Sequence, residues 1–405
     1  MDVQVSNFLK ILRTIFDDKQ EISLIEPVDW ELLSKIARKQ NILPLFFEAA
    51  NSIEDYVNAS VYTKDQLDTF AMVAEQIQRS SAFIAVYEKI TDQGIYPIVM
   101  KGIVCRYLYG ELGEHRPSGD EDLLIEIKDF YKVKTILEQE GYACEFTDVT
   151  ETQLEQIQEV TFYNMDQKLL LEVHTNVMGK ANEERTRMSN IFQNAHERGR
   201  IMQIYGIDVK VMGATDALLL LILHTYKHFM GYGVGIRQII DILLCYREYK
   251  HEISKEYFDK VLKICRAEHF WNDIRYIGNQ YLGLCEEYGE TLCCPEELLD
   301  DMMESGVFGS VEKTDRIAGG INILMSDHAS DQSKLYRMFR AAFPSRRFLL
   351  AGYPYLEKKP WLLPKAWAMR LRKYIRYAGK DVWKISNEIL QKSASRIELI
   401  KKYKM

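Results

Sequence analysis

The stretch Arg116-Pro-Ser-Gly-Asp-Glu-Asp-Leu-Leu-Ile125 places two aspartates, Asp120 and Asp122, at the start of a predicted strand. Successive side chains of a strand point to opposite faces of the sheet, so these two carboxylates share one face and can approach the same metal ions. Glu121 lies between them and must point to the other face, away from the metals. A carboxylate buried there without a partner would be costly.

A second predicted strand supplies a third carboxylate. The segment Leu169-Leu-Leu-Glu-Val-His174 places Glu172 and His174 together on one face. Carboxylates from two neighbouring strands offer the oxygen ligands and negative charge that a pair of Mg²⁺ ions needs, with room for substrate phosphates. The sequence therefore predicts a metal site formed by Asp120, Asp122 and Glu172, for two Mg²⁺ ions or alternatively Mn²⁺. His174 would orient Glu172 or contact the substrate.

Phosphate ligands are predicted upstream of the aspartates. Residues 98–100 form a short apolar run typical of a strand, and Lys101-Gly102 separates it from a predicted helix over 103–109. A glycine at this point lets backbone amides approach a phosphate, and the lysine adds a point charge. Arg116 and Ser118, in the loop before Asp120, complete the predicted nucleotide-binding set with His174.

Each of these motifs is weak alone. An Asp-x-Asp pair occurs by chance in many proteins, where it is most often part of a solvated turn, and Lys-Gly is weaker still. The ordered series is much harder to obtain by accident: strand, glycine turn, helix, Asp-x-Asp strand, helix, acidic strand. It is this combination that favours a catalytic site.

The pattern around the site predicts an α+β fold, in which a small mixed β-sheet core is flanked by N- and C-terminal helical regions. The expected strands include 123–127, 143–146, 160–164 and 169–173. Helices are expected over 130–140, 216–229 and 236–249, and 257–284 continues the helical bundle. The expected division is a helical region over 1–94, a catalytic core over 95–212, a helical domain over 213–304, a linker or mobile loop over 305–333 and a basic, aromatic-rich tail over 334–405.

One long helix is predicted over 63–92. It would begin with a capping box formed by Thr63 and Gln66 and end at Gly94. Its apolar residues recur at helical spacing and would form the face that packs on the core. They are Leu67, Phe70, Ala74, Ile77, Ile84 and Tyr87.

Composition excludes several classes of protein. Hydrophobic residues make up 47% and aromatic residues 11% of the 405 residues, which argues against wholesale disorder, a collagenous repeat or a coiled-coil rod. The N-terminus lacks a signal-peptide pattern, and the longest aliphatic run, 218–223, is too short to span a bilayer. Seven cysteines without a Cys-x-x-Cys pair fit reduced thiols. We therefore expect a cytoplasmic protein, with a peripheral position at the membrane as the alternative.

The net charge of −7 conceals a partition. Residues 334–405 carry 19 Lys and Arg against 4 Asp and Glu, together with three of the five tryptophans. Basic residues interleaved with aromatics can bind an anionic membrane surface, a polyanionic glycan or nucleic acid. The alternative is that this tail packs against the acidic remainder of the chain.

The order of motifs resembles the polymerase-beta-like nucleotidyltransferase superfamily, whose signature is a glycine-containing turn, then Asp-x-Asp, then a third carboxylate. More closely, the chain is similar to a family of uncharacterised nucleotidyltransferases in which Lys-Gly replaces Gly-Gly or Gly-Ser. Features beyond the site also match that family: a helix over 30–45 that ends Asn-Ile-Leu-Pro-Leu, the Glu-x-His of Glu172, the pair His224 and His228 followed by Arg237 and Asp241, and the segments Phe343-Pro-Ser and Tyr353-Pro. The superfamily usually has an apolar residue where Glu121 stands and a serine where Ile103 stands.

The resemblance implies an enzyme that moves a nucleoside monophosphate from a nucleoside triphosphate such as ATP to an unidentified acceptor. The alternative is a non-catalytic or phosphoryl-transferring nucleotide-binding protein associated with cell-surface polysaccharide assembly. His224 and His228, at i and i+4 on one helical face, would pack the helix or line the nucleotide cleft. Arg237 and Asp241 are more consistent with an ion pair, within the helix or between domains, than with catalysts.

Overall fold

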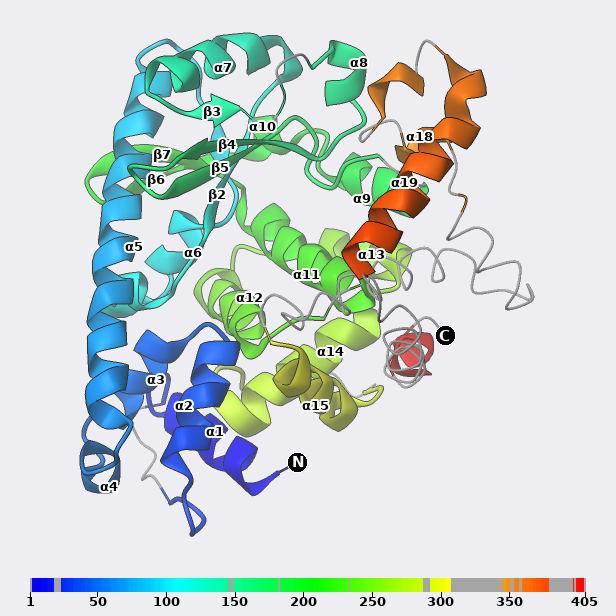
Figure 1. Ribbon diagram of the computed structural model, residues 1–405. Helices are drawn as coiled ribbons and strands as arrows, with labels where there is room; N and C mark the ends of the chain where they lie inside the picture. Colours follow the sequence, from blue (N-terminus) through cyan, green and yellow to red (C-terminus); the bar gives the residue numbers. More distant parts are fainter. Residues whose placement is uncertain are drawn as a thin grey trace.

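The computed structural model describes residues 2–17, 23–144, 146, 149–180, 183–231, 233–286, 292–306, 343, 346–349, 353–356, 359–378, 396 and 398–403. Within these ranges the strands form one mixed sheet of seven strands, in the order β3-β4-β5-β2-β1-β7-β6 (Figure 1). Their bounds are β1 (Ile98–Val99), β2 (Asp120–Leu124), β3 (Ala143–Cys144), β4 (Glu159–Asn164), β5 (Leu169–His174), β6 (Arg200–Ile204) and β7 (Ile207–Val211). Helices flank this sheet, so the predicted α+β class is confirmed.

The register of the central strands brings the acidic residues together. β2 runs parallel to β5, with Asp122 opposite Glu172. β4 runs antiparallel to β5 on its other side, with Glu159 opposite His174. Because side chains alternate between the faces of a strand, these four residues lie on one face of the sheet.

The opposite face of the sheet packs on two helices, α5 (Tyr62–Thr91) and α7 (Phe130–Gln139). Their shared apolar core includes Leu123, Leu171 and Val173 from the strands and Phe83 and Phe130 from the helices. The alternation of apolar and acidic residues along β2 and β5 therefore separates a packed face from a polar one.

A helical region covers the acidic face. It is built from α1 (Val3–Arg13), α2 (Trp30–Lys39), α3 (Leu43–Ala50), α4 (Glu54–Val57), α11 (Ala214–Gly231), α12 (Ile236–Tyr249), α13 (Lys255–Cys265), α14 (Glu268–Ile277) and α15 (Pro295–Ser305). Phe8 and Phe46 from the N-terminal helices and Leu223 and Phe270 from the later ones belong to one buried cluster. The two ends of the described chain therefore share a single core, seen below the sheet in Figure 1.

Shorter elements complete the described structure: α6 (Ile103–Tyr107), the 3-10 helix η1 (Gly110–His115), α8 (Glu151–Leu154), α9 (Glu183–Ile191), α10 (Ala195–Arg198), the π-helical turn η3 (Gly278–Leu282), α18 (Arg346–Leu349) and α19 (Leu363–Ala378). No helix among the described residues has the length and apolar character required to cross a membrane.

The structure adds to the sequence predictions at some points and differs from them at others. The hairpin of β6 and β7 was not predicted, although its turn carries the signal Tyr205-Gly206, with φ +49° and +84°. The stretch 257–284 continues the helical bundle as expected, and it does so in two helices, because Arg266 adopts φ +53° at the end of α13 and the chain restarts as α14. The Thr63 capping box is wrong, since α5 begins after Val61 without a side-chain cap.

The predicted core face of α5 is wrong along its first half. Leu67, Phe70 and Ile77 are 62%, 59% and 50% exposed, while Tyr87 is buried as expected. Polar residues occupy the inward face instead: Asp65, Thr69, Gln76 and Ser80 are all buried. Periodicity located the apolar stripe correctly but could not show which side of the helix meets the body.

The described part of the tail contacts the acidic body at its C-terminal end. Arg396 pairs with Asp301 at 3.4 Å, and Lys402 pairs with Glu297 at 2.6 Å. Tyr403 is buried and its hydroxyl donates to Asp273. Binding of the tail to a membrane, a glycan or nucleic acid stays a prediction, and of the predicted linker over 305–333 only residues 305 and 306 lie within the described residues.

The inward polar face of α5 is anchored by Asp65, which is fully buried. Its carboxylate accepts hydrogen bonds from Ser34 Oγ at 2.7 Å, Arg38 Nη2 at 2.6 Å and Tyr56 Oη at 2.8 Å. Burial together with the Asp65 carboxylate raises the pKa of the Tyr56 hydroxyl well above its ordinary value. The Asp65 carboxylate of α5 is thus hydrogen-bonded to both α2 and α4.

We predict that Asp65→Ala lowers the free energy of unfolding by about 3–5 kcal/mol, because it leaves the Arg38 charge and two hydroxyls without their buried partner. Asp68→Ala is the matched control. Asp68 also pairs with Arg38, at 2.6 Å, but its side chain is 40% exposed, so the expected loss is about 1 kcal/mol or less. Equal shifts of the two variants in urea or thermal unfolding would contradict this account.

Candidate active site

The Asp122 carboxylate is the centre of the acidic face. It is buried, and its Oδ1 atom lies 3.0 Å from Lys101 Nζ and 3.0 Å from His174 Nε2. Burial by itself raises the pKa of a carboxyl group, but the two cationic partners outweigh it and hold the pKa of Asp122 well below its usual range. Asp122 is therefore ionised at any ordinary pH.

Glu172 and His174 complete the cluster from β5. His174 Nε2 lies 3.7 Å from Glu172 Oε2, and the ligand atoms of Asp122, Glu172 and His174 all lie within 4.8 Å of one another. Burial opposes the charge on His174, yet hydrogen bonds to Asp122 and Glu172 raise its pKa to about 9. The structure thus adds His174 to the residues able to ligate a metal, where the sequence predicted only a neighbouring role.

Asp120 does not belong to this compact group. It lies at the start of β2, on the same face as Asp122 and partly exposed. Its charge acts on Lys101, as do those of Asp122 and Glu172. Asp120 is therefore at the rim of the cluster, with Asp122 below it.

Glu121 faces the other way and is fully paired. Its Oε1 accepts from Arg106 Nη2 at 2.6 Å, and its Oε2 accepts from the Ile103 amide at 2.7 Å. Gly102 adopts φ +58°, and a Cβ at this position would lie 1.9 Å from Glu121 Oε2. The glycine of the Lys-Gly turn is therefore required by Glu121, and the Ile103 amide, which the sequence offered to a phosphate, is used by the same carboxylate.

Arg116 and Ser118 are held by the protein itself. Arg116 binds Asp241 of α12 with two hydrogen bonds, of 3.0 and 2.5 Å, and Tyr109 donates to the same carboxylate at 2.8 Å. Ser118 accepts from the buried Arg106 and donates its amide to Gln76 at 2.8 Å. Asp241 thus forms an ion pair between elements, with Arg116. The predicted phosphate role of Arg116 and Ser118 would require these contacts to open.

Helix α11 contributes a polar stripe that faces the acidic cluster. His224 and His228 lie on it with their Nε2 atoms 2.9 Å apart. Burial, with the nearby positive charges of Lys101 and Lys227, lowers the pKa of both imidazoles well below the ordinary value. The pair is therefore neutral and lies near enough to Lys101 to be affected by its charge.

Two charged residues near the cluster were not found from the sequence. Burial raises the pKa of Glu159, beside His174 in the sheet, and its Oε2 has no hydrogen-bond partner within the described chain. Lys227 donates to Gln158 Oε1 at 3.0 Å. Burial, with Arg185 and Lys101, lowers its pKa to about 7 against the pull of Glu159 and Glu172. Neither residue lies in a motif, and only the pairing of β4 with β5 and the docking of α11 place them here.

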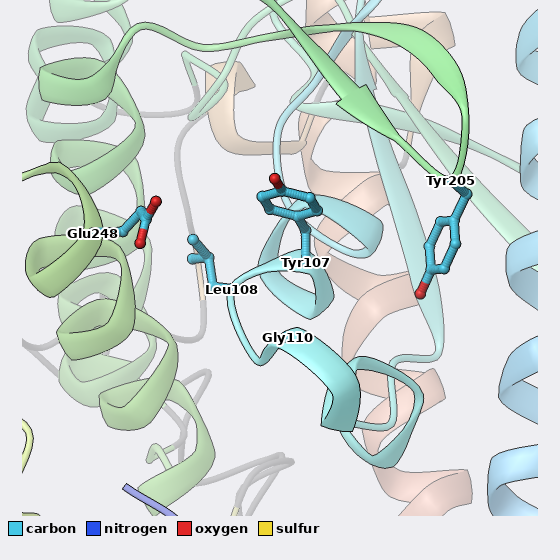
Figure 2. A pocket seen from close by; sticks show the side chains of 5 residues that line it. All are labelled: Tyr107, Leu108, Gly110, Tyr205 and Glu248. Atoms are coloured by element: carbon cyan, nitrogen blue, oxygen red, sulfur yellow. The ribbon is translucent and has the colours of Figure 1, made fainter.

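Two other features are distinct from this cluster. An open pocket of about 480 Å³ lies at the far end of α6, where Figure 2 shows Tyr107 and Tyr205 with Glu248. Its lining, as far as the described residues show it, has no basic side chain, so the pocket does not suit nucleotide phosphates. Asp273, Cys293 and Cys294 also lie together, with the two Sγ atoms 3.5 Å apart, but the Asp273 carboxylate accepts both cysteine amides at 2.9 Å and acts as a structural acceptor.

Comparison with known families gives one match, to the model of the family described as uncharacterised nucleotidyltransferase, over residues 26–283. The chain belongs to this family. The matched region contains the whole cluster, from Lys101 to Lys227, and most of the helical region around it. Comparison with curated proteins and with solved structures finds no match.

The Lys-Gly turn gives a test of this geometry. We predict that Gly102→Ala destabilises the protein by about 2 kcal/mol or more beyond Gly94→Ala, because it displaces Glu121 from its buried partners. Gly94 is the control: it also has a positive φ, +74°, but nothing lies within 4 Å of a Cβ built there, so its cost is about 1–2 kcal/mol of backbone strain. Thermal unfolding measures both, and equal losses would contradict the clash.

Proposed function

We propose that this protein is a metal-dependent enzyme that transfers a nucleoside monophosphate from a nucleoside triphosphate to an acceptor. The observation that carries the proposal is the group Asp122, Glu172 and His174, with Asp120 at its rim, in a chain of this family. Membership of the family supports nucleotidyl transfer in general. The acidic cluster supports the chemistry of the step.

The residues fit divalent metal. Two carboxylates and an imidazole lie within 4.8 Å of one another, and Asp120 and Glu159 add negative charge around them. Oxygen-rich donor sets of this kind suit Mg²⁺ or Mn²⁺. When bound, such ions would neutralise charge on the phosphates and lower the pKa of the acceptor hydroxyl. Lys101 and His174 each contact the Asp122 carboxylate at 3.0 Å.

Two lysines are the candidate phosphate ligands. Lys101 lies on Asp122, so a metal there would release its amine towards a substrate. Lys227 lies on the facing helix, and among the described residues no carboxylate is within ion-pair distance of its Nζ; its contact is the neutral Gln158. A partly buried amine without an ion-pair partner is a natural ligand for a phosphate. Since Arg116 is bound to Asp241, we assign the triphosphate to the lysines.

Glu121 does not argue against activity. It is buried on the face of β2 away from the cluster and paired with Arg106 at 2.6 Å. Its negative charge is thereby compensated. The alternative, a non-catalytic nucleotide-binding protein, draws on Glu121, on Ile103 and on the basic tail. The contact of the Ile103 amide with Glu121 in the Lys-Gly turn accounts for the first two.

We predict that Asp122→Asn and Glu172→Gln each reduce nucleotidyl transfer at least ~100-fold, because removing one charged ligand costs several kcal/mol of transition-state stabilisation. Transfer is measured with α-labelled and γ-labelled triphosphates, Mg²⁺ and a panel of acceptors. Glu126→Gln, at an exposed carboxylate after β2, is the control and should retain full activity. Label moving from the γ position alone would mean phosphoryl transfer, and unchanged turnover in both cluster variants would refute the proposal.

Lys227→Gln should raise the KM for the triphosphate roughly tenfold with a smaller change in kcat, since a charge-assisted hydrogen bond to phosphate is worth about 1.5–3 kcal/mol. Lys260→Gln, on the exposed surface of α13, is the matched control. A KM that does not distinguish the two variants would remove Lys227 from the phosphate site while leaving the metal site untouched.

A further inference from the structure

From Asp65 to Ser80, helix α5 turns polar side chains towards the body of the protein and apolar ones outward. Its inward face carries the buried polar residues Asp65, Thr69, Gln76 and Ser80, and its outward face carries Leu67, Phe70 and Ile77, each at least half exposed. Figure 1 shows this helix running along one edge of the molecule. A row of large apolar side chains on a surface marks an interaction site, because each keeps a hydration shell that contact with a partner would release.

The outward residues follow the spacing of a coiled-coil seam. Thr63, Leu67, Phe70, Ala74, Ile77, Ser81, the partly buried Ile84 and Glu88 are separated alternately by four and three residues. Between Lys64 and Glu88 the most exposed positions of the helix are uncharged, and of the charged side chains there Asp68 is the most exposed, at 40%. Such a seam fits the side of another helix along its length, not a small ligand.

The seam is complementary to itself when a copy runs antiparallel. With a two-fold axis between Glu75 and Gln76, Phe70 meets Ser81 of the copy, Ile77 meets Ala74, and Leu67 meets Ile84. Bulky residues thus oppose small ones in two of these layers, which lets the helices approach closely and interdigitate. Few foreign helices would match this sequence as closely as its own reverse does.

Charge at the ends of the seam selects the same arrangement. Lys64 and Glu88 are both exposed and lie at opposite ends. In an antiparallel pair Lys64 of each copy lies beside Glu88 of the other, whereas a parallel pair would bring like charges together.

A neighbouring turn extends the apolar surface. Gln78 Nε2 donates to the Asp166 carbonyl at 3.4 Å and Arg79 Nε to that of Lys168 at 2.9 Å, so the turn between β4 and β5 lies against α5. Met165 in this turn is 78% exposed. The surface is therefore broader than the helix alone.

We infer that the protein forms a homodimer through the outward face of α5, with the two helices antiparallel. The inference is independent of nucleotidyl transfer, because α5 covers the face of the sheet opposite the acidic cluster. The dimer leaves both clusters facing away from the interface.

Sedimentation velocity of the full-length protein across a wide range of concentrations tests it. We expect a dimer, and we expect Phe70→Glu and Ala74→Glu each to give monomers with an unchanged melting temperature, since both side chains face outward. Tyr131→Glu, at an exposed aromatic residue of α7 (47% exposed), should leave the dimer intact. A wild-type monomer at every concentration, or a dimer indifferent to the α5 variants, would overturn the inference.

Exchange of the two charges then tests whether the paired helices run antiparallel. Lys64→Glu and Glu88→Lys should each weaken the dimer, and the double variant should restore it, because the antiparallel pairs are re-formed with their signs reversed. Failure of the double variant to recover would exclude the antiparallel pair. Flotation of the wild-type protein with anionic vesicles, lost in Phe70→Glu while the protein is monomeric in solution, would assign the face to a membrane and contradict the dimer.

Discussion

The arrangement of the site depends on one buried ionised carboxylate, Asp122. An unpaired charge at this depth would cost several kcal/mol, so the fold has to bring compensating groups to it. Lys101 comes from the end of β1 and His174 from the end of β5, each at 3.0 Å from Oδ1. Because β2 lies between β1 and β5 in the sheet, both cations reach Asp122.

The two faces of β2 contact different parts of the protein, because successive side chains of a strand point to opposite faces. Asp120 and Asp122 face the helical region and its polar stripe on α11. Glu121 faces the packed side, where it binds Arg106 and fixes the turn at Gly102. The acidic residue that departs from the superfamily pattern thus supports the turn that carries Lys101.

Much of this site could be predicted, because it depends on the spacing of residues that are close together in the sequence. Asp120, Asp122, Glu172 and His174 follow from the period of two within strands, and Lys101 from its place between a strand and a helix. What could not be predicted depends on distant contacts. Arg116 binds Asp241, a helical residue far along the chain, and Lys227 and Glu159 reach the cluster only through the docking of α11 and the pairing of β4. The fold class could be predicted because it also follows from local patterns. The outward face of α5 could not, since an amphipathic pattern does not show which side of the helix packs against the protein.

The central claim is that metal replaces Lys101 on Asp122. A crystal structure with Mn²⁺ and a nucleoside triphosphate analogue that resists cleavage between its α and β phosphates tests it most directly. The account predicts an anomalous Mn²⁺ peak ligated by Asp122 and Glu172, with the Lys101 amine moved from Asp122 onto a phosphate oxygen. Nucleotide bound elsewhere, with no peak at this cluster and with Lys101 and His174 still on Asp122, would contradict it.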